Sequence, residues 1–255
     1  MLKWCSYCQQ FLGEVPDYDN FSISHGICPE CHADLLEQGD VDLTRPLLLK
    51  AVQRKLCTAG LENNLVAAAK VIDDAVSTGL RPVDILIGMV APMLYQVGED
   101  WKTGVFSVEQ ERRFTAFCEK LIDLVTTKLQ PNASPNSKSN GAILLMNAPG
   151  NVHTLGLRIL ALWLASKGKT ATILDTQDAA NLLELIETTR PELLLISVAL
   201  QEQYLGLKEI IEQVAKLAES IRPRVVVGGA VMSVLKRFVA GGRRGVEPHR
   251  GECCP

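Results

Sequence analysis

The chain has 255 residues, of which 47% are hydrophobic and 22% are charged, a balance that is ordinary for soluble proteins with one large core or two smaller ones. Its formal net charge of −3 offers no positive surface, so direct binding to nucleic acid or to an anionic membrane is not expected. The start of the chain has no apolar signal segment, and the longest apolar run, around Val83 to Leu94, is too short to cross a bilayer. We therefore expect a cytoplasmic protein.

Residues 1–38 are turn-rich and contain two Cys-x-x-Cys pairs, Cys5 with Cys8 and Cys28 with Cys31. In a cytosolic protein such pairs indicate metal ligands rather than disulfides, and their spacing is typical of a structural zinc ribbon. Four thiolates close a tetrahedral Zn²⁺ site and leave no open position for catalysis. His25 and His32 are alternative ligands nearby, and unligated reduced cysteines or a redox pair are the alternatives to a metal site.

Residues 40–130 are predicted to be helical throughout. The apolar residues recur at helical spacing in four stretches, and glycines stand where helix ends belong. The stretches are Thr44–Cys57, Leu61–Val76, Pro82–Val97 and Val108–Leu129, with Gly60, Gly79 and Gly104 between them. Short connections between four helices predict a four-helix bundle, and the polar residues 131–140 are predicted to be a linker.

Residues 141–240 alternate short apolar runs with amphipathic stretches, which predicts a parallel sheet covered by helices on both faces. The expected strands are Ala142–Met146, Thr170–Leu174, Leu193–Ser197 and Arg224–Val227, and the expected helices are Leu155–Lys167, Ala179–Thr188 and Leu205–Ile221. The fold class is therefore α/β with an all-α cap: a Rossmann-like, flavodoxin-like domain after a bundle. Ligands of such sheets bind beyond the carboxyl ends of the strands.

The loop from Asn147 to Gly156 follows the first of these strands and carries His153. A histidine at the ligand-binding edge is a candidate metal ligand. Taken alone, however, a loop histidine is more often a solvated or capping residue.

The segment Asn151-Val-His-Thr-Leu-Gly156 resembles the Asp/Glu-x-His-x-x-Gly motif of cobalamin-binding domains. The resemblance implies that His153 is the lower ligand of cobalt and that Gly156 belongs to the site. Ser197-Val-Ala199 and Gly228-Gly229 follow the third and fourth strands, where this family places a serine motif and paired glycines around the buried nucleotide tail. The alternative for the glycines is an ordinary strand-to-helix turn.

Two positions depart from the family pattern. Asn151 stands where the family has an acid that hydrogen-bonds the ligand histidine, and an amide in this place makes the histidine less basic. Ala199 removes one polar contact. Both departures predict weaker or more labile cobalamin binding.

The resemblance extends upstream to residues 86–111, which are similar to the four-helix cap of methionine synthases, corrinoid methyl carriers and light-sensing regulators. It implies that Trp101, together with Met93 and Val97, covers the upper face of the corrin. Glu111 matches the Glu-His pair of the light sensors, but Arg112 replaces the histidine, which weakens a photochemical role. The alternative for Trp101 is a half-buried aromatic of the bundle.

The N-terminal segment with its four cysteines also resembles a Cys-rich module attached to bacterial sensor kinases and response regulators, which favours signalling. At the other end, residues 241–255 show no strand or helix pattern. We expect a truncation or reading-frame change there, with a natural disordered tail as the alternative.

These observations predict a cobalamin-binding sensory or regulatory protein, with adenosyl- or methylcobalamin clamped between cap and domain and Zn²⁺ on the cysteines. The signal would be light or the cofactor itself, and a protein partner would receive it. A corrinoid methyl carrier serving methyltransferases is the alternative, and an interaction protein that no longer binds cobalamin is a third. The sequence leaves the oligomeric state open, a homo-oligomer included.

Overall fold

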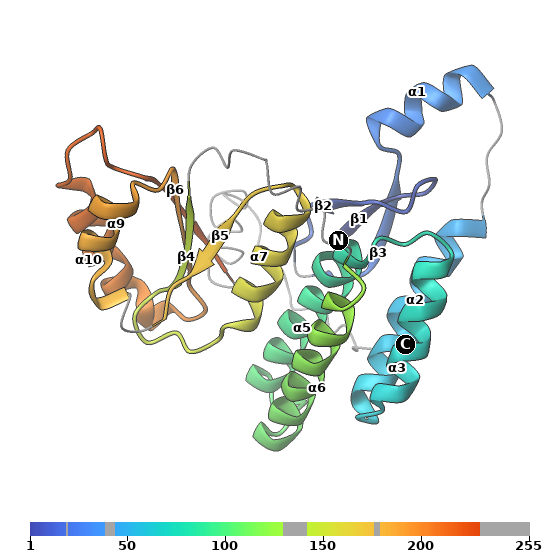
Figure 1. Ribbon diagram of the computed structural model, residues 1–255. Coiled ribbons are helices and arrows are strands. Elements are labelled where there is room, and N and C mark those ends of the chain that lie inside the picture. Colours follow the sequence, from blue (N-terminus) through green and yellow to red (C-terminus); the bar gives the residue numbers. More distant parts are fainter. Residues whose placement is uncertain (19, 39–43, 130–141, 176–178, 230–255) are drawn as a thin grey trace, which may run out of the picture. The chain divides into compact units, whose positions relative to one another are not determined.

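The computed structural model describes the chain except for residues 19, 39–43, 130–141, 176–178 and 230–255 (Figure 1). The described residues form two compact units, 1–129 and 142–229. The predicted linker 131–140 and the segment 241–255 lie outside the described residues. Among the helices that are described, none is both long and apolar enough to span a bilayer.

The N-terminal unit begins with a small sheet whose central strand is the first one. β1 (Leu2–Cys5) pairs antiparallel with β2 (Phe11–Glu14) and parallel with β3 (Ile23–Gly26). α1 (Pro29–Gln38) follows β3. The side chains of Leu2, Trp4 and Cys5 on β1 are almost fully buried, so this strand is the core of the module.

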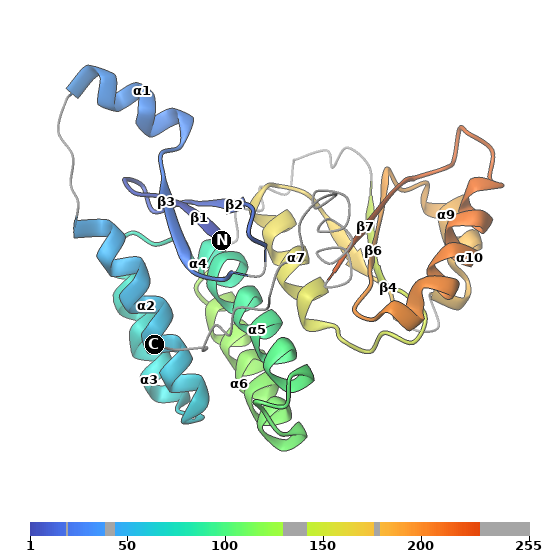
Figure 2. The same cartoon turned by 180° about the vertical axis from the view of Figure 1, so that it is seen from behind.

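The rest of this unit is the predicted helical bundle, which the fold confirms. Its helices are α2 (Thr44–Leu61), α3 (Leu65–Ser77), α4 (Pro82–Ile85), α5 (Ala91–Lys102) and α6 (Val108–Thr126). A π-helical turn, η1 (Leu86–Val90), joins α4 to α5 in one continuous helical run. Figures 1 and 2 show α2 beside α3 and α5 beside α6. α6 begins with a capping box in which Ser107 and Gln110 satisfy each other's backbone N–H groups.

The predicted helix end at Gly60 is wrong, because α2 continues through Gly60 to Leu61. A side chain at Gly60 would meet the ring of Phe114 on α6, with an ideal Cβ only 2.6 Å from Phe114 Cε2. Gly60 is therefore a contact point between helices. Gly79 and Gly104 do follow helix ends, with φ of +99° and +76° that favour glycine.

The second unit is a parallel sheet of four strands, as predicted. Its strands are β4 (Ile143–Asn147), β5 (Ala171–Ile173), β6 (Leu193–Ser197) and β7 (Arg224–Gly228), in the order β5-β4-β6-β7. α7 (Leu155–Ser166) covers one face, and α9 (Leu182–Thr189) and α10 (Tyr204–Ala215) cover the other (Figures 1 and 2). A short 3-10 helix, η2 (Gln201–Gln203), leads into α10.

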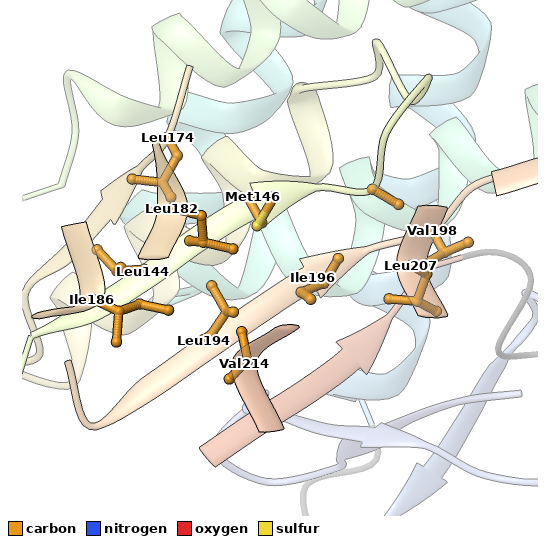
Figure 3. Packing of buried hydrophobic residues seen from close by; sticks show 11 residues of the cluster. Leu144, Met146, Leu174, Leu182, Ile186, Leu194, Ile196, Val198, Leu207 and Val214 are labelled. Atoms are coloured by element: carbon orange, nitrogen blue, oxygen red, sulfur yellow. The ribbon is translucent and has the colours of Figure 1, made fainter. Parts of the chain in front are cut away.

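Burial on both faces of the sheet explains why its strands are continuous apolar runs. Leu144 and Met146 of β4 pack with side chains of α9 and α10, such as Ile186 and Leu207 (Figure 3). Ile143 and Leu145, their neighbours in sequence, pack on the opposite face with Leu157 and Leu164 of α7. Helices therefore cover both faces of the sheet, and the carboxyl ends of its strands remain as the place where a ligand can bind.

Candidate functional site

The carboxyl edge of the second unit aligns the ends of three neighbouring strands. In the sheet register Asn147 stands opposite Ser197, and Ser197 stands opposite Gly228. The connections after β4 and β6 lead to helices on opposite faces of the sheet. The gap between β4 and β6 is therefore the topological switch point, where open parallel sheets bind ligands.

Asn151 fixes the start of the loop after β4. Its side chain is 7% exposed, and its Nδ2 donates to the Ser197 carbonyl and to Asn147 Oδ1, both at 3.1 Å. Its Oδ1 accepts from the backbone N–H of His153 at 3.0 Å. The amide thus ties the loop to β6. A carboxylate could not donate to the Ser197 carbonyl, so the departure from the family's acid has a structural use here.

His153 itself is exposed, and within the described part of the chain no residue hydrogen-bonds its ring. The ring is therefore available to a ligand at the sheet edge. Gly156 lies in the first turn of α7, with no atom within 4 Å of an added Cβ. The helix thus leaves open space beside the histidine loop.

The paired glycines after β7 differ from each other. At Gly229 φ is +108° and a Cβ would collide with the backbone of Val198, whose nitrogen would lie 2.8 Å away. The chain's own fold therefore requires this glycine. At Gly228 an added Cβ would meet nothing within 4 Å, so only Gly228 borders space that a ligand can use.

Ala199, the other departure, lies in the loop after β6. Its backbone N–H donates to Oε1 of the buried Gln203 at 2.9 Å, and the same oxygen accepts from the backbone of Leu200 at 3.1 Å. Gln203 therefore holds this loop from within the chain, without a polar side chain at position 199.

Exposed apolar residues after β4 and β6 were not predicted from the sequence. Val152, Leu200, Tyr204 and Leu205 are exposed large hydrophobic residues in the segments that follow β4 and β6. The two segments meet where Pro149 packs on Gly206, since a Cβ there would lie 3.0 Å from Pro149 Cβ. For Val152 and Leu200 the available signal was an apolar residue in a connection after a strand, because loops are ordinarily polar, whereas Tyr204 and Leu205 begin α10. Contiguous exposed apolar residues are typical of a binding surface.

In the N-terminal unit, Trp101 lies in the last turn of α5 and is 45% exposed. Val97 and Met93 occupy the same helical stripe one and two turns earlier, but both are buried in the bundle. Val105 and Val108 are exposed soon after Trp101. The exposed apolar residues of this region thus gather at the carboxyl end of α5 and the start of α6.

Glu111 and Arg112 stand on the first turns of α6. Glu111 Oε1 accepts from Thr115 Oγ1 at 2.8 Å, so its carboxylate is held on its own helix. Arg112 is exposed.

Asp100, next to Trp101, is a carboxyl that the sequence analysis did not single out. Its side chain is buried; Oδ1 accepts from Gln96 Nε2 at 2.8 Å, while Oδ2 has no partner among the described residues. Burial raises the pKa of Asp100 above its ordinary value; the Gln96 hydrogen bond opposes this and the charge of Glu99 adds to it.

The four cysteine sulfurs of the N-terminal module lie within 4.8 Å of one another. Cys8 Sγ and Cys28 Sγ are 3.8 Å apart, which is too far for a disulfide. The separation matches the distance of roughly 3.8 Å between two sulfurs of a tetrahedral site with Zn–S bonds of about 2.3 Å. The backbone N–H of Cys28 donates to Cys5 Sγ, and that of Cys31 donates to Cys28 Sγ, both at 3.4 Å. These sulfurs fit one tetrahedral metal ion.

The electrostatics of the cluster point the same way. Burial acts to raise the pKa of Cys5, but hydrogen bonds from the backbone of Cys28, Cys8 and Tyr7 lower it to about 7. Burial raises the pKa of Cys8 to about 11 and raises that of Cys31 further. The Cys5 thiolate therefore forms easily, whereas Cys8 and Cys31 resist ionisation, and a divalent cation would stabilise their charged forms.

Family models match both units. Residues 33–126 and residues 141–247 each match a model described as a B12 binding domain. The chain is a cobalamin-binding protein. Its two matched segments are the helical cap and the Rossmann-like domain, which confirms the fold class and the resemblance drawn from the His153 loop and the Trp101 region.

Relatives of this cobalamin-binding protein include a 20.5 kDa protein from the bchF-crtJ intergenic region of Rhodobacter capsulatus, 28% identical over 54% of this chain and 71% of that protein. Another is monomethylamine corrinoid protein 1 of Methanosarcina acetivorans, 23% identical over 70% of this chain and 84% of the relative. The solved structure of the monomethylamine corrinoid protein of Methanosarcina barkeri superimposes with a TM-score of 0.61 at 19% identity, covering 76% and 91% of the two chains. This likeness shows a shared fold.

Proposed function

We propose that this cobalamin-binding protein is a corrinoid methyl carrier that serves partner methyltransferases. Relatives that match about two thirds of the chain are named corrinoid proteins of monomethylamine and trimethylamine. The sensory role that the Cys-rich module favoured receives no support from these names, and Arg112 departs from the light-sensor pattern. The methyl-carrier alternative is therefore the better hypothesis.

The observation that carries the proposal is the exposed imidazole of His153 at the switch point of the sheet. We propose that its ring coordinates cobalt from below. Asn151 would hold the loop against β6 through the hydrogen bond to Ser197, while the space beside Gly228 and Gly156 would admit the nucleotide tail. Bound cobalamin supplies a cobalt that takes up and releases a methyl group.

We propose that the cap shields the upper face of the corrin through Trp101. The indole is exposed at the end of α5, and Met93 and Val97 extend its stripe into the bundle. Glu111 and Ala199 would border the cofactor at the two units. Since a methyl carrier exchanges a small group with an enzyme, methylcobalamin is the expected loaded form and a methyltransferase the expected protein partner.

We also propose that Cys5, Cys8, Cys28 and Cys31 hold one structural Zn²⁺. The sulfur separations support this metal, and a module of this size has too few core residues to fold without a staple. With all four positions taken by sulfur, the ion has no place for substrate.

The test begins with visible spectra of the pure protein titrated with aquocobalamin and methylcobalamin. We expect a shifted spectrum that His153→Ala abolishes. The methyl-loaded protein is then offered to candidate methylamine methyltransferases, and its demethylation is followed by the spectrum of the cobalt. Transfer to none of them, together with a light-dependent change in assembly of the adenosylcobalamin form, would overturn the carrier in favour of the sensor.

A further inference from the structure

The Cys-rich module is anchored to the bundle by Trp4, the residue before the first cysteine ligand. Trp4 is fully buried, and its ring packs edge-on against Phe11 of β2 with centroids 5.4 Å apart. Trp4 and Cys5 are adjacent on β1, so loss of the strand's order at Cys5 would also displace the backbone that holds the indole.

The indole sits against Gly88 in the π-helical turn between α4 and α5. A Cβ at Gly88 would overlap Trp4 Cζ2, and it would lie 3.0 Å from Trp4 Cε2 and 2.9 Å from Phe11 Cδ2. Only a glycine leaves room for the ring. The widened turn at Leu86–Val90 therefore forms the seat for the module, and π-turns of this kind are frequent at functional positions.

Two further contacts join the module to the bundle. The ring of Phe21 stacks on Tyr95 of α5, with centroids 6.4 Å apart and planes at 6°. The Phe21 carbonyl accepts from Gln53 Nε2 of α2 at 3.1 Å. The module thus contacts the same helical run, residues 82–102, that carries Trp101 in its last turn.

We propose that metal occupancy of the four-cysteine site controls the order of the helical cap, with Trp4 seated on Gly88 as the connecting contact. Without metal the small sheet loses its staple, since structural zinc sites supply much of the folding free energy of such modules. Trp4 then leaves Gly88, and the π-turn loses the rings that cover it. The helical run Leu86–Val97 becomes less protected.

The test measures amide hydrogen exchange of peptides covering residues 86–97 in the full chain without cobalamin, with zinc and after its removal by a chelator under reducing conditions. We expect zinc removal to speed exchange of these amides by about tenfold or more. Zinc-independent exchange, or a chain that binds no metal, overturns the proposal.

Gly88→Ala and Gly98→Ala form a matched pair on the same helical run. A methyl at Gly88 excludes the indole, whereas an added Cβ at Gly98 meets nothing within 4 Å. We expect both variants to bind zinc, but only Gly88→Ala to lose the zinc effect on exchange. Trp4→Leu removes the indole that contacts Gly88, so we expect it to lose the zinc effect on exchange as Gly88→Ala does. If either variant retains the full zinc effect, the connection through Trp4 is wrong.

One consequence rests on the proposed function: zinc removal should also weaken binding of aquocobalamin by about tenfold. A chain that shows the zinc effect on exchange but binds no cobalamin supports this inference and overturns the proposed function. A chain that binds cobalamin equally with and without zinc, with unchanged exchange, overturns the inference and leaves the proposed function standing.

Discussion

The two units present their candidate ligands in opposite ways. The N-terminal unit gathers four sulfurs within 4.8 Å and buries Cys5 and Cys28. The C-terminal unit exposes one imidazole, that of His153, on a loop whose supporting Asn151 is buried. The proposed metals would account for the difference. For zinc on the cysteines the chain would have to supply all four ligands, whereas the cobalt of a corrin is already held by its ring nitrogens and would need only one axial ligand and a surface.

The comparison predicts that removal of a cysteine ligand disrupts folding. In Cys28→Ser we expect zinc affinity to fall by at least about 100-fold and the module to unfold, because the remaining sulfurs can no longer enclose the ion. Zinc stoichiometry and circular dichroism measure this. Cys57→Ala, at a buried bundle cysteine outside the cluster, is the control and should keep its zinc. A folded, zinc-loaded Cys28→Ser chain would contradict the four-thiolate site.

Removal of the imidazole should instead affect only the cofactor. In His153→Ala we expect affinity for cobalamin to fall by about 100-fold, while the free energy of unfolding without cofactor changes by less than about 0.5 kcal/mol because the ring is exposed. Spectral titration and thermal unfolding measure the two effects. Thr154→Ala, at the next exposed position, should bind normally. Equal affinity in His153→Ala and the parent chain would exclude the histidine as the ligand.

The paired glycines sharpen the comparison within one unit. Gly229→Ala should lower the free energy of unfolding by about 2–4 kcal/mol, since it needs a positive φ and meets the Val198 backbone. Gly228→Ala should leave the free energy of unfolding within about 0.5 kcal/mol and lower cobalamin affinity instead. Denaturant unfolding and spectral titration separate the two effects. If Gly228→Ala binds as well as the parent chain, the open space beside it is not used by the cofactor.

Much of the fold could be predicted because its cause is local in the sequence. The strands are continuous apolar runs since both faces of the sheet are covered, and β6 matches its predicted bounds, Leu193–Ser197. The helix end at Gly60 failed for the opposite reason. Glycine is a poor helix former, but the Phe114 ring that fills the space above it comes from a helix distant in the sequence.

In the candidate site, too, features with a local cause in the sequence could be predicted, and features that depend on distant contacts could not. His153, Ser197 and Gly228 could be singled out because they lie at or just after the carboxyl ends of strands. The π-turn that receives Trp4 could not, since it depends on a contact between segments far apart in the chain. Nor could the bonding of Asn151, which was expected to serve the imidazole but holds the loop through Ser197 and the His153 backbone.

Asn151→Asp tests whether that amide is structural. The carboxylate cannot donate hydrogen bonds to Ser197 and Asn147, and it faces the Ser197 carbonyl. We therefore expect the free energy of unfolding to fall by about 1–3 kcal/mol. The loss should shrink in acid, where the protonated carboxyl regains a donor. Thermal unfolding against pH measures this, with Asn147→Ala as a variant that removes only one of the two bonds. A variant as stable as the parent chain at neutral pH would show that the amide is not needed.

The smallest expected effect concerns Asp100, the buried carboxyl beside Trp101. Its folded-state pKa is raised by burial, so folding favours the protonated form. Its contribution to stability is thus fully present below the unfolded pKa of about 3.9 and is lost as the pH rises through the folded pKa.

Asp100→Asn removes this titration. We expect the variant to gain less than about 1 kcal/mol at neutral pH and nothing in acid, since solvent screening limits the effect. Thermal midpoints of the two proteins between acid and neutral pH measure the difference. A constant difference across the pH range would mean that folding does not shift the pKa of Asp100.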